Sequence, residues 1–83
     1  MRLIKLTEEK VIPQRDGNNH VIGIHKVYEA RYFNVDKIEN FSRLKNTTYL
    51  YMSTSSAAFV VVEPPEEIIQ LIEQAKEIKP WTY

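Results

Sequence analysis

The sequence predicts an α+β fold: a small antiparallel β-sheet of three to five strands, with one C-terminal amphipathic helix packed on one face. Two observations predict it. β-Branched and aromatic residues dominate several short stretches between residues 3 and 62, which is typical of strands. Residues 65–79 then place apolar side chains at a helical period. A chain of 83 residues is expected to form one domain. We assign it to residues 1–80, followed by an aromatic C-terminal tail at 81–83.

The first half of the chain predicts strands separated by one strong turn. Residues 3–6, LIKL, favour a first strand. Residues 15–19, RDGNN, indicate a turn because aspartate, glycine and asparagine tolerate a positive φ. We interpret residues 8–26 as an excursion from the sheet in the form of a hairpin arm, and residues 27–33 as a sheet strand.

Two residues of this arm predict irregularities. Pro13 has no N–H for a ladder hydrogen bond, so it is expected at an edge or outside the sheet. Gly23 lies in a β-rich stretch and predicts a bulge.

The second half alternates turns with short strands. Val35, Ile38 and Phe41 are three residues apart, which indicates a helical or 3₁₀ turn that directs apolar side chains to the core. Lys45 and Asn46 form a turn. Two strands are then expected, TTYLYMS at residues 47–53 and FVVV at residues 59–62.

The predicted helix has marked ends. Proline suits the first helical position, Glu66 and Glu67 suit the positive end of the helix dipole, and Pro80 ends the helix. Its apolar face needs a partner surface, and the preceding sheet is the nearest one. That face comprises Ile68, Leu71, Ile72, Ala75 and Ile78.

The predicted interaction surface follows from the alternation of side chains in a strand. If Leu50 and Met52 face the helix, Tyr49 and Tyr51 lie on the opposite face, which nothing else in the chain is expected to cover. Tyrosine and tryptophan are enriched at protein interfaces. We therefore expect a protein partner or a second copy of the chain to bind Tyr49, Tyr51, Trp81 and Tyr83.

The net charge indicates which classes of partner to expect. Acids and bases number 11 each, so the net charge is zero and gives no general attraction to nucleic acid, whereas it favours self-association. The alternative is a small nucleic-acid-binding protein that stacks bases on an aromatic sheet face. That face would use Tyr28, Tyr32, Tyr49 and Tyr51 with Lys26, Arg31 and Lys45.

No motif for catalysis, a cofactor or a metal is expected. His20 and His25 are five residues apart, which places them on opposite faces of an extended strand. No GxSxG motif accompanies Ser53, Ser55 or Ser56, and two glycines supply no phosphate-binding loop. There is no cysteine and no apolar run of signal-peptide or membrane-span length. We expect a cytoplasmic protein that is not an enzyme.

Residues 1–7 and 33–73 carry an ordered set of motifs: LIKLT, FNVDKIENF, TTYLYMS and FVVVEPPEEIIQLIE. This order resembles the small bacterial flagellar-associated family called FlbD. The matching positions are Asn34, Asp36, Ile38, Thr48, Leu50, Val61, Val62, Glu63, Glu66 and Glu67. The resemblance implies non-enzymatic support of flagellar motility in a bacterium. A prophage-encoded protein of similar fold is the alternative.

Overall fold

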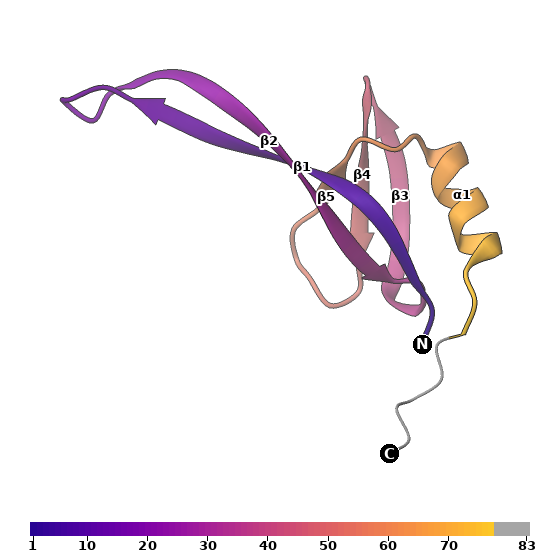
Figure 1. The fold of residues 1–83 in the computed structure, drawn as a ribbon. Coiled ribbons are helices and arrows are strands. Elements are labelled where there is room, and N and C mark those ends of the chain that lie inside the picture. The colour runs from indigo at the N-terminus through magenta and orange to yellow at the C-terminus, as the bar shows by residue number, and fades with distance from the viewer. Residues whose placement is uncertain (78–83) are drawn as a thin grey trace.

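The computed structural model describes residues 1–77, and these form an antiparallel sheet and a C-terminal helix (Figure 1). The strand order is β2-β1-β5-β4-β3, and every pairing is antiparallel. The small α+β fold predicted from the sequence is confirmed. The elements are β1 Leu3–Arg15, β2 Val21–Asn34, the 3₁₀ turn η1 Val35–Lys37, β3 Ile38–Leu44, β4 Thr47–Met52, β5 Phe59–Val61 and α1 Pro65–Gln74.

A long β1–β2 hairpin extends beyond the rest of the sheet (Figure 1). Within residues 1–77, β1 pairs with β5 at Glu8 and beyond that point with β2 alone. We call residues 9–28 the arm. It makes the molecule elongated: the radius of gyration is 15.9 Å, against about 12 Å expected for a compact domain of this length. The predicted hairpin excursion is present, although β1 and β2 run through it without interruption.

The turn at the arm's tip has the predicted chemistry. The Asp16 carboxylate accepts hydrogen bonds from the backbone N–H groups of Asn18 at 2.8 Å and His20 at 2.9 Å. Asn19 adopts a positive φ of 64°. Among the strands of residues 1–77, only β2 lies beside β1 at Pro13, and the bulge is at Ile22, next to Gly23.

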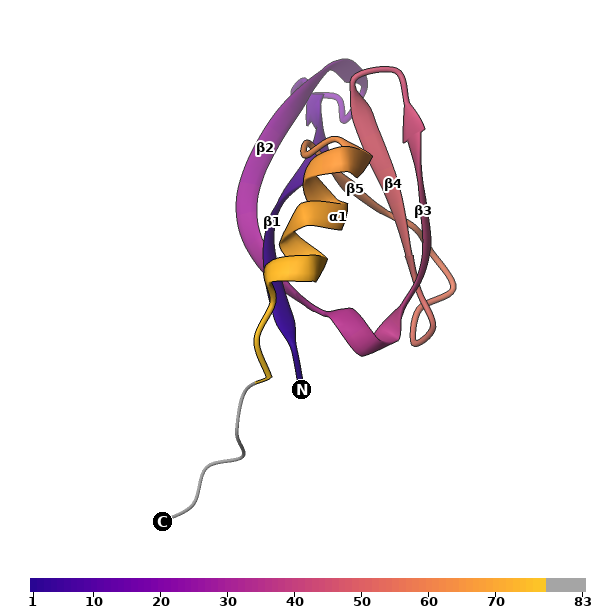
Figure 2. The ribbon, with the colours of Figure 1, turned by 90° about the vertical axis from the view of Figure 1, so that its right-hand side faces the viewer.

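The core is one buried cluster to which the strands and α1 both contribute side chains. Figure 2 shows α1 in front of β1, β5 and β4, and Ile68 of α1 is 0% exposed. The rings of Phe33 and Phe59 meet edge to face, with centroids 5.3 Å apart. Strands far apart in the sequence are therefore joined by one buried cluster: Ile4, Leu6, Phe33, Val35, Leu50, Met52, Val61 and Ile68.

Residues 38–44 differ from the prediction. The 3₁₀ turn ends at Lys37, and β3 follows where a continued turn was expected. Ile38 pairs with Met52 and Asn40 with Tyr51, so Glu39 is an extra residue in β3. This bulge places Ile38 and Phe41 on the same face, where both pack against the core. A spacing of three, typical of a helix, here results from a bulged strand.

The helix is shorter than predicted. It ends at Gln74, and Ala75 is its C-cap, with an extended ψ of 131°. Glu77 then forms an isolated antiparallel bridge with Arg2 and an ion pair with the N-terminal amine. Ile78, assigned above to the apolar helix face, lies outside the described residues. Within residues 1–77, no helix combines the length and apolarity needed to cross a membrane.

Candidate interaction surface

The side chains of β4 alternate as the sequence predicts. Thr48, Leu50 and Met52 are buried. Tyr49 and Tyr51 point to the opposite side, where Tyr49 is half-buried and Tyr51 is 38% exposed. We call the side that carries these two tyrosines the outer face.

Strand register extends the outer face to the hairpin. We call the opposite side, which carries the buried Thr48, Leu50 and Met52, the inner face. Thr48 pairs with Val61, and Val61 pairs with Glu8, so Val61 and Glu8 join Thr48 on the inner face. Their neighbours in sequence, Tyr49 and Thr7 among them, therefore lie on the outer face.

Two further tyrosines join this face. Thr7 pairs with Ala30, so residues two positions from Ala30, Tyr28 and Tyr32, also lie on the outer face. Their side chains are 54% and 64% exposed. The outer face thus carries tyrosines from both β2 and β4.

The arm exposes aliphatic side chains that the sequence analysis did not single out. Five of them are 49–67% exposed: Val11, Ile12, Val21, Ile22 and Ile24. Scattered exposed apolar residues are ordinary, but this group lies on one two-stranded ribbon far from the core. The signal was present in the sequence, since a hairpin that leaves its sheet cannot bury the β-branched residues that build it.

Basic side chains of the hairpin are paired with acids. Arg31 donates a hydrogen bond of 3.0 Å to Glu8 and lies over the Phe59 ring, 4.8 Å from its centroid. Lys26 lies 3.5 Å from Glu9. The cations that would attract a phosphate backbone are thus partly neutralised within the chain, which disfavours the nucleic-acid alternative.

The pair formed by Lys10 and Glu29 is the closest of these ion pairs, at 2.5 Å between Nζ and Oε1. Their hydrogen bond and charge attraction raise the pKa of Lys10 and lower the pKa of Glu29. Both side chains are solvent-exposed, so this pair orders the arm locally without a large effect on stability.

The remaining candidates from the sequence are two C-terminal aromatic residues and two histidines. Trp81 and Tyr83 lie outside the described residues. His20 Nδ1 is 3.8 Å from Asp16, and His25 is opposite Ile12 in the register. Across residues 1–77, no three histidine, aspartate or glutamate side chains converge as a metal site would require.

Glu63 links the segment before α1 to the sheet. Both of its carboxylate oxygens lie 2.9 Å from the Thr7 backbone nitrogen, which donates to them. The Thr48 hydroxyl donates to the Glu63 carbonyl at 2.7 Å. Glu63 therefore joins the β5–α1 connection to β1. Its carboxylate accepts from a backbone N–H of β1, as a carbonyl of a neighbouring strand would.

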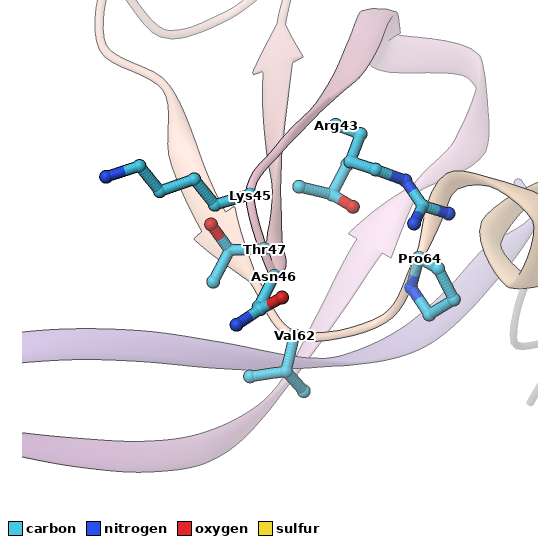
Figure 3. A pocket seen from close by; sticks show the side chains of 7 residues that line it. Arg43, Lys45, Asn46, Thr47, Val62 and Pro64 are labelled. Carbon is cyan, nitrogen blue, oxygen red and sulfur yellow. The ribbon is translucent and has the colours of Figure 1, made fainter.

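A pocket of about 250 Å³ lies beside the β3–β4 turn. Figure 3 shows its two cations directed away from each other, and Arg43 is already hydrogen-bonded to Glu66 at 2.6 Å. Backbone hydrogen bonding and Arg43 lower the pKa of Glu66. The volume is below the roughly 300–1,000 Å³ of typical small-molecule sites. Its lining is Arg43, Lys45, Asn46, Thr47, Thr48, Val62 and Pro64.

Comparison with known proteins finds no family model, no curated protein and no solved structure that matches the chain.

Proposed function

We propose that the chain is a non-enzymatic assembly module that binds a protein, in the first place a second copy of itself, through the outer face and the arm. The observation that carries this proposal is the set of exposed aliphatic side chains on the arm. Exposed apolar surface is commonly retained where a partner covers it.

The division of the sheet into two faces supports the proposal. On the inner face, α1 supplies Ile68 to the core, and we take the helix to be packed over this face. The outer face keeps Tyr28, Tyr32 and Tyr51 in contact with solvent. Tyrosine contributes large contact area at little entropic cost, so this face suits a protein partner.

Light scattering on purified protein tests the proposal. We expect a concentration-dependent oligomer, and the double substitution Ile22→Ser and Ile24→Ser should weaken it by about ten-fold or more because four aliphatic side chains are lost per dimer. Tyr51→Ser should weaken it less, because that side chain is more buried than the arm residues.

Ile69→Ser is the matched control. Ile69 is similarly exposed, at 47%, but belongs to α1 and not to the arm or to β4. The control should associate as the unmodified protein does. A protein that stays monomeric at several hundred micromolar would remove self-association from the proposal. Equal weakening by the arm and Ile69 substitutions would show that the arm is not the contact.

The biological setting we propose follows the FlbD-like resemblance: support of flagellar motility in a bacterial cytoplasm. The motifs that support it include LIKLT in β1 and the residues that lead into α1. A gene located among flagellar genes would agree with this setting. A gene located among phage tail or capsid genes would instead favour the prophage alternative.

A further inference from the structure

We infer that β2 pairs edge to edge with β2 of a second copy, antiparallel and centred on Ala30. This inference rests on the proposed self-assembly and names the contact that carries it. Among the strands of residues 1–77, β2 is at the end of the sheet and pairs only with β1. An uncovered edge strand is a template for pairing with another chain.

The direction of the backbone groups shows which residues can pair. The Thr7 N–H donates to Glu63, and the Thr7 carbonyl accepts from the Val62 N–H at 3.0 Å, so both groups point toward β5. Thr7 is directly opposite Ala30. In an antiparallel ladder, the backbone groups of such a non-hydrogen-bonded pair point away from each other. The N–H and carbonyl of Ala30 therefore point to the free edge of β2.

Alternation along the strand extends this result. Tyr28 and Tyr32 are two residues from Ala30 on either side, in a register without a shift, so their backbone groups also point outward. All residues from 28 to 32 are exposed. The free edge thus presents three successive sets of unpaired donors and acceptors.

The sequence at this edge is complementary to itself. Residues 28–32 read YEARY. An antiparallel pairing centred on Ala30 places Tyr28 opposite Tyr32 of the second copy, and Glu29 opposite Arg31 of the second copy. Each outward-pointing N–H then meets an outward-pointing carbonyl, and the two alanines at the symmetry axis leave room for close approach. Aromatic pairs and opposite charges are the cross-strand pairs that stabilise a sheet.

Neighbouring registers lack this complementarity. Centring on Glu29 or Arg31 would place like charges opposite each other at the axis, which is destabilising. Centring on Tyr28 would place Arg31 opposite His25 of the second copy and would leave Glu29 opposite Val27. Among these registers, only the one centred on Ala30 pairs opposite charges and also pairs aromatic side chains.

The existing ion pairs leave room for this contact. Glu8 and Glu29 are directly opposite each other across β1 and β2, which places two acids side by side. Arg31 uses one guanidinium nitrogen for Glu8, and its side chain remains 45% exposed. The arginine of a second copy would add a cation on the open side of Glu29, where it opposes this repulsion.

Amide hydrogen exchange at increasing protein concentration tests the inference residue by residue. The amides of Tyr28, Ala30 and Tyr32 should exchange rapidly in dilute protein and become protected as it associates. The amides of Glu29 and Arg31 point toward β1 and should be protected at every concentration. Association without protection of the three outward amides would overturn the edge contact.

Ala30→Pro tests the same edge by light scattering. It removes an outward-pointing N–H and leaves the β1–β2 ladder its hydrogen bonds, so the fold should be retained, as circular dichroism would show. We expect the dimer to weaken by at least about ten-fold, since one bond is lost from each copy. Ala30→Ser keeps the N–H and is the matched control. An unweakened Ala30→Pro dimer would contradict the inference.

A charge exchange separates pairing from loss of folding. The Arg31→Glu copy has two acids at the complementary positions, and the Glu29→Arg copy has two bases. Each should self-associate at least about ten-fold more weakly than the unmodified chain, whereas a mixture should form heterodimers. Heterodimer formation cannot arise from a folding defect in either chain. If the two variants associate with each other no more tightly than each associates with itself, the inferred register is wrong.

The outcomes separate this inference from the proposed function. An oligomer that survives Ala30→Pro but is weakened by the Ile22 and Ile24 substitutions keeps the proposed function and removes the edge contact. A dimer weakened by Ala30→Pro but unaffected by the arm substitutions keeps the edge and removes the arm as the surface. A monomer at all concentrations removes both.

Discussion

Strands β1 and β2 run through both the arm and the rest of the sheet, which we call the body. Their apolar side chains are buried only in the body. In β1, Ile4 and Leu6 are buried, whereas Val11 and Ile12 are about half exposed. Ile4, Leu6 and Ile12 lie on the same face of β1 by alternation, and all of these residues are paired with β2. The difference is what lies beside the hairpin, because β5 reaches β1 only as far as Glu8.

This comparison shows that burial in this molecule depends on a third strand and the helix rather than on local sequence. A two-stranded ribbon has no inside, and such hairpins are marginal in water. The arm is supported by local contacts instead: the hydrogen bonds of Asp16 in its turn and the ion pairs that join β1 to β2. A partner that covers the arm would give it the surface that the body already has.

The largest difference between the two regions should appear in stability. Ile68→Ala removes a side chain that is 0% exposed and should lower the free energy of unfolding by about 2–5 kcal/mol. Ile24→Ala removes the same atoms from the arm, where the side chain is 63% exposed, and should change it by roughly 0.5 kcal/mol or less.

Urea denaturation of both variants, at a concentration where the protein is monomeric, measures this difference. The two variants share one chemical change, so the difference in cost reports mainly burial. The smaller propensity changes favour alanine in the helix and isoleucine in the strand, which reduces the difference. Equal costs would mean that the arm is packed against something in the free monomer, or that Ile68 is outside the core.

A smaller and more local effect is expected at the arm's turn. Asp16→Ala removes the acceptor for the Asn18 and His20 N–H groups and should destabilise the arm by about 1–2 kcal/mol. Hydrogen exchange should accelerate in the arm while the amides of β4 keep their protection, because the body does not depend on the turn. Asp16→Asn keeps a side-chain acceptor and should have the smaller effect. Faster exchange in β4 would show that the arm and the body unfold as one unit.

Much of the fold could be predicted from local sequence. Asp16 and Asn19 form the predicted turn, Lys45 takes a positive φ in the predicted turn between β3 and β4, and the alternation in β4 is as expected. These features depend on a few neighbouring residues, so local chemistry is sufficient to predict them. The order of the strands and the reach of β5 along β1 depend on contacts between distant residues, and no local pattern encodes them.

The errors have the same physical origin. The bulge at Glu39 changes the side on which later residues lie, so Ile38 and Phe41 share a face at a helical spacing. The helix ends at Gln74 without a local stop signal, and the following residues bridge to Arg2 at the other end of the chain. The candidate surface was predicted in part: Tyr49 and Tyr51 lie on the expected face, but the exposure of Ile22 and Ile24 depends on where β5 stops.

The smallest expected effect concerns the ion pair between Lys10 and Glu29 on the arm. The Lys10 ammonium lowers the pKa of Glu29 by hydrogen bonding and charge, so Lys10→Gln should raise the pKa of Glu29 toward its ordinary value of 4.5. A carboxyl group with a lowered pKa stabilises the folded state above its ordinary pKa. That contribution is lost as the pH falls through the lowered value. The unmodified protein should therefore lose slightly more stability than the variant on acidification below about pH 4.5.

An NMR titration of the Glu29 side chain in dilute protein measures this shift. Lys26→Gln is the matched control, because Lys26 pairs with Glu9 instead and should leave the titration of Glu29 unchanged. The Lys10 and Glu29 side chains are both exposed, so added salt should reduce the shift in the unmodified protein. If the Glu29 pKa does not move in Lys10→Gln, this ion pair does not hold β1 to β2 in solution. The arm would then depend on its turn and backbone ladder alone, and the contrast with the body would be sharper still.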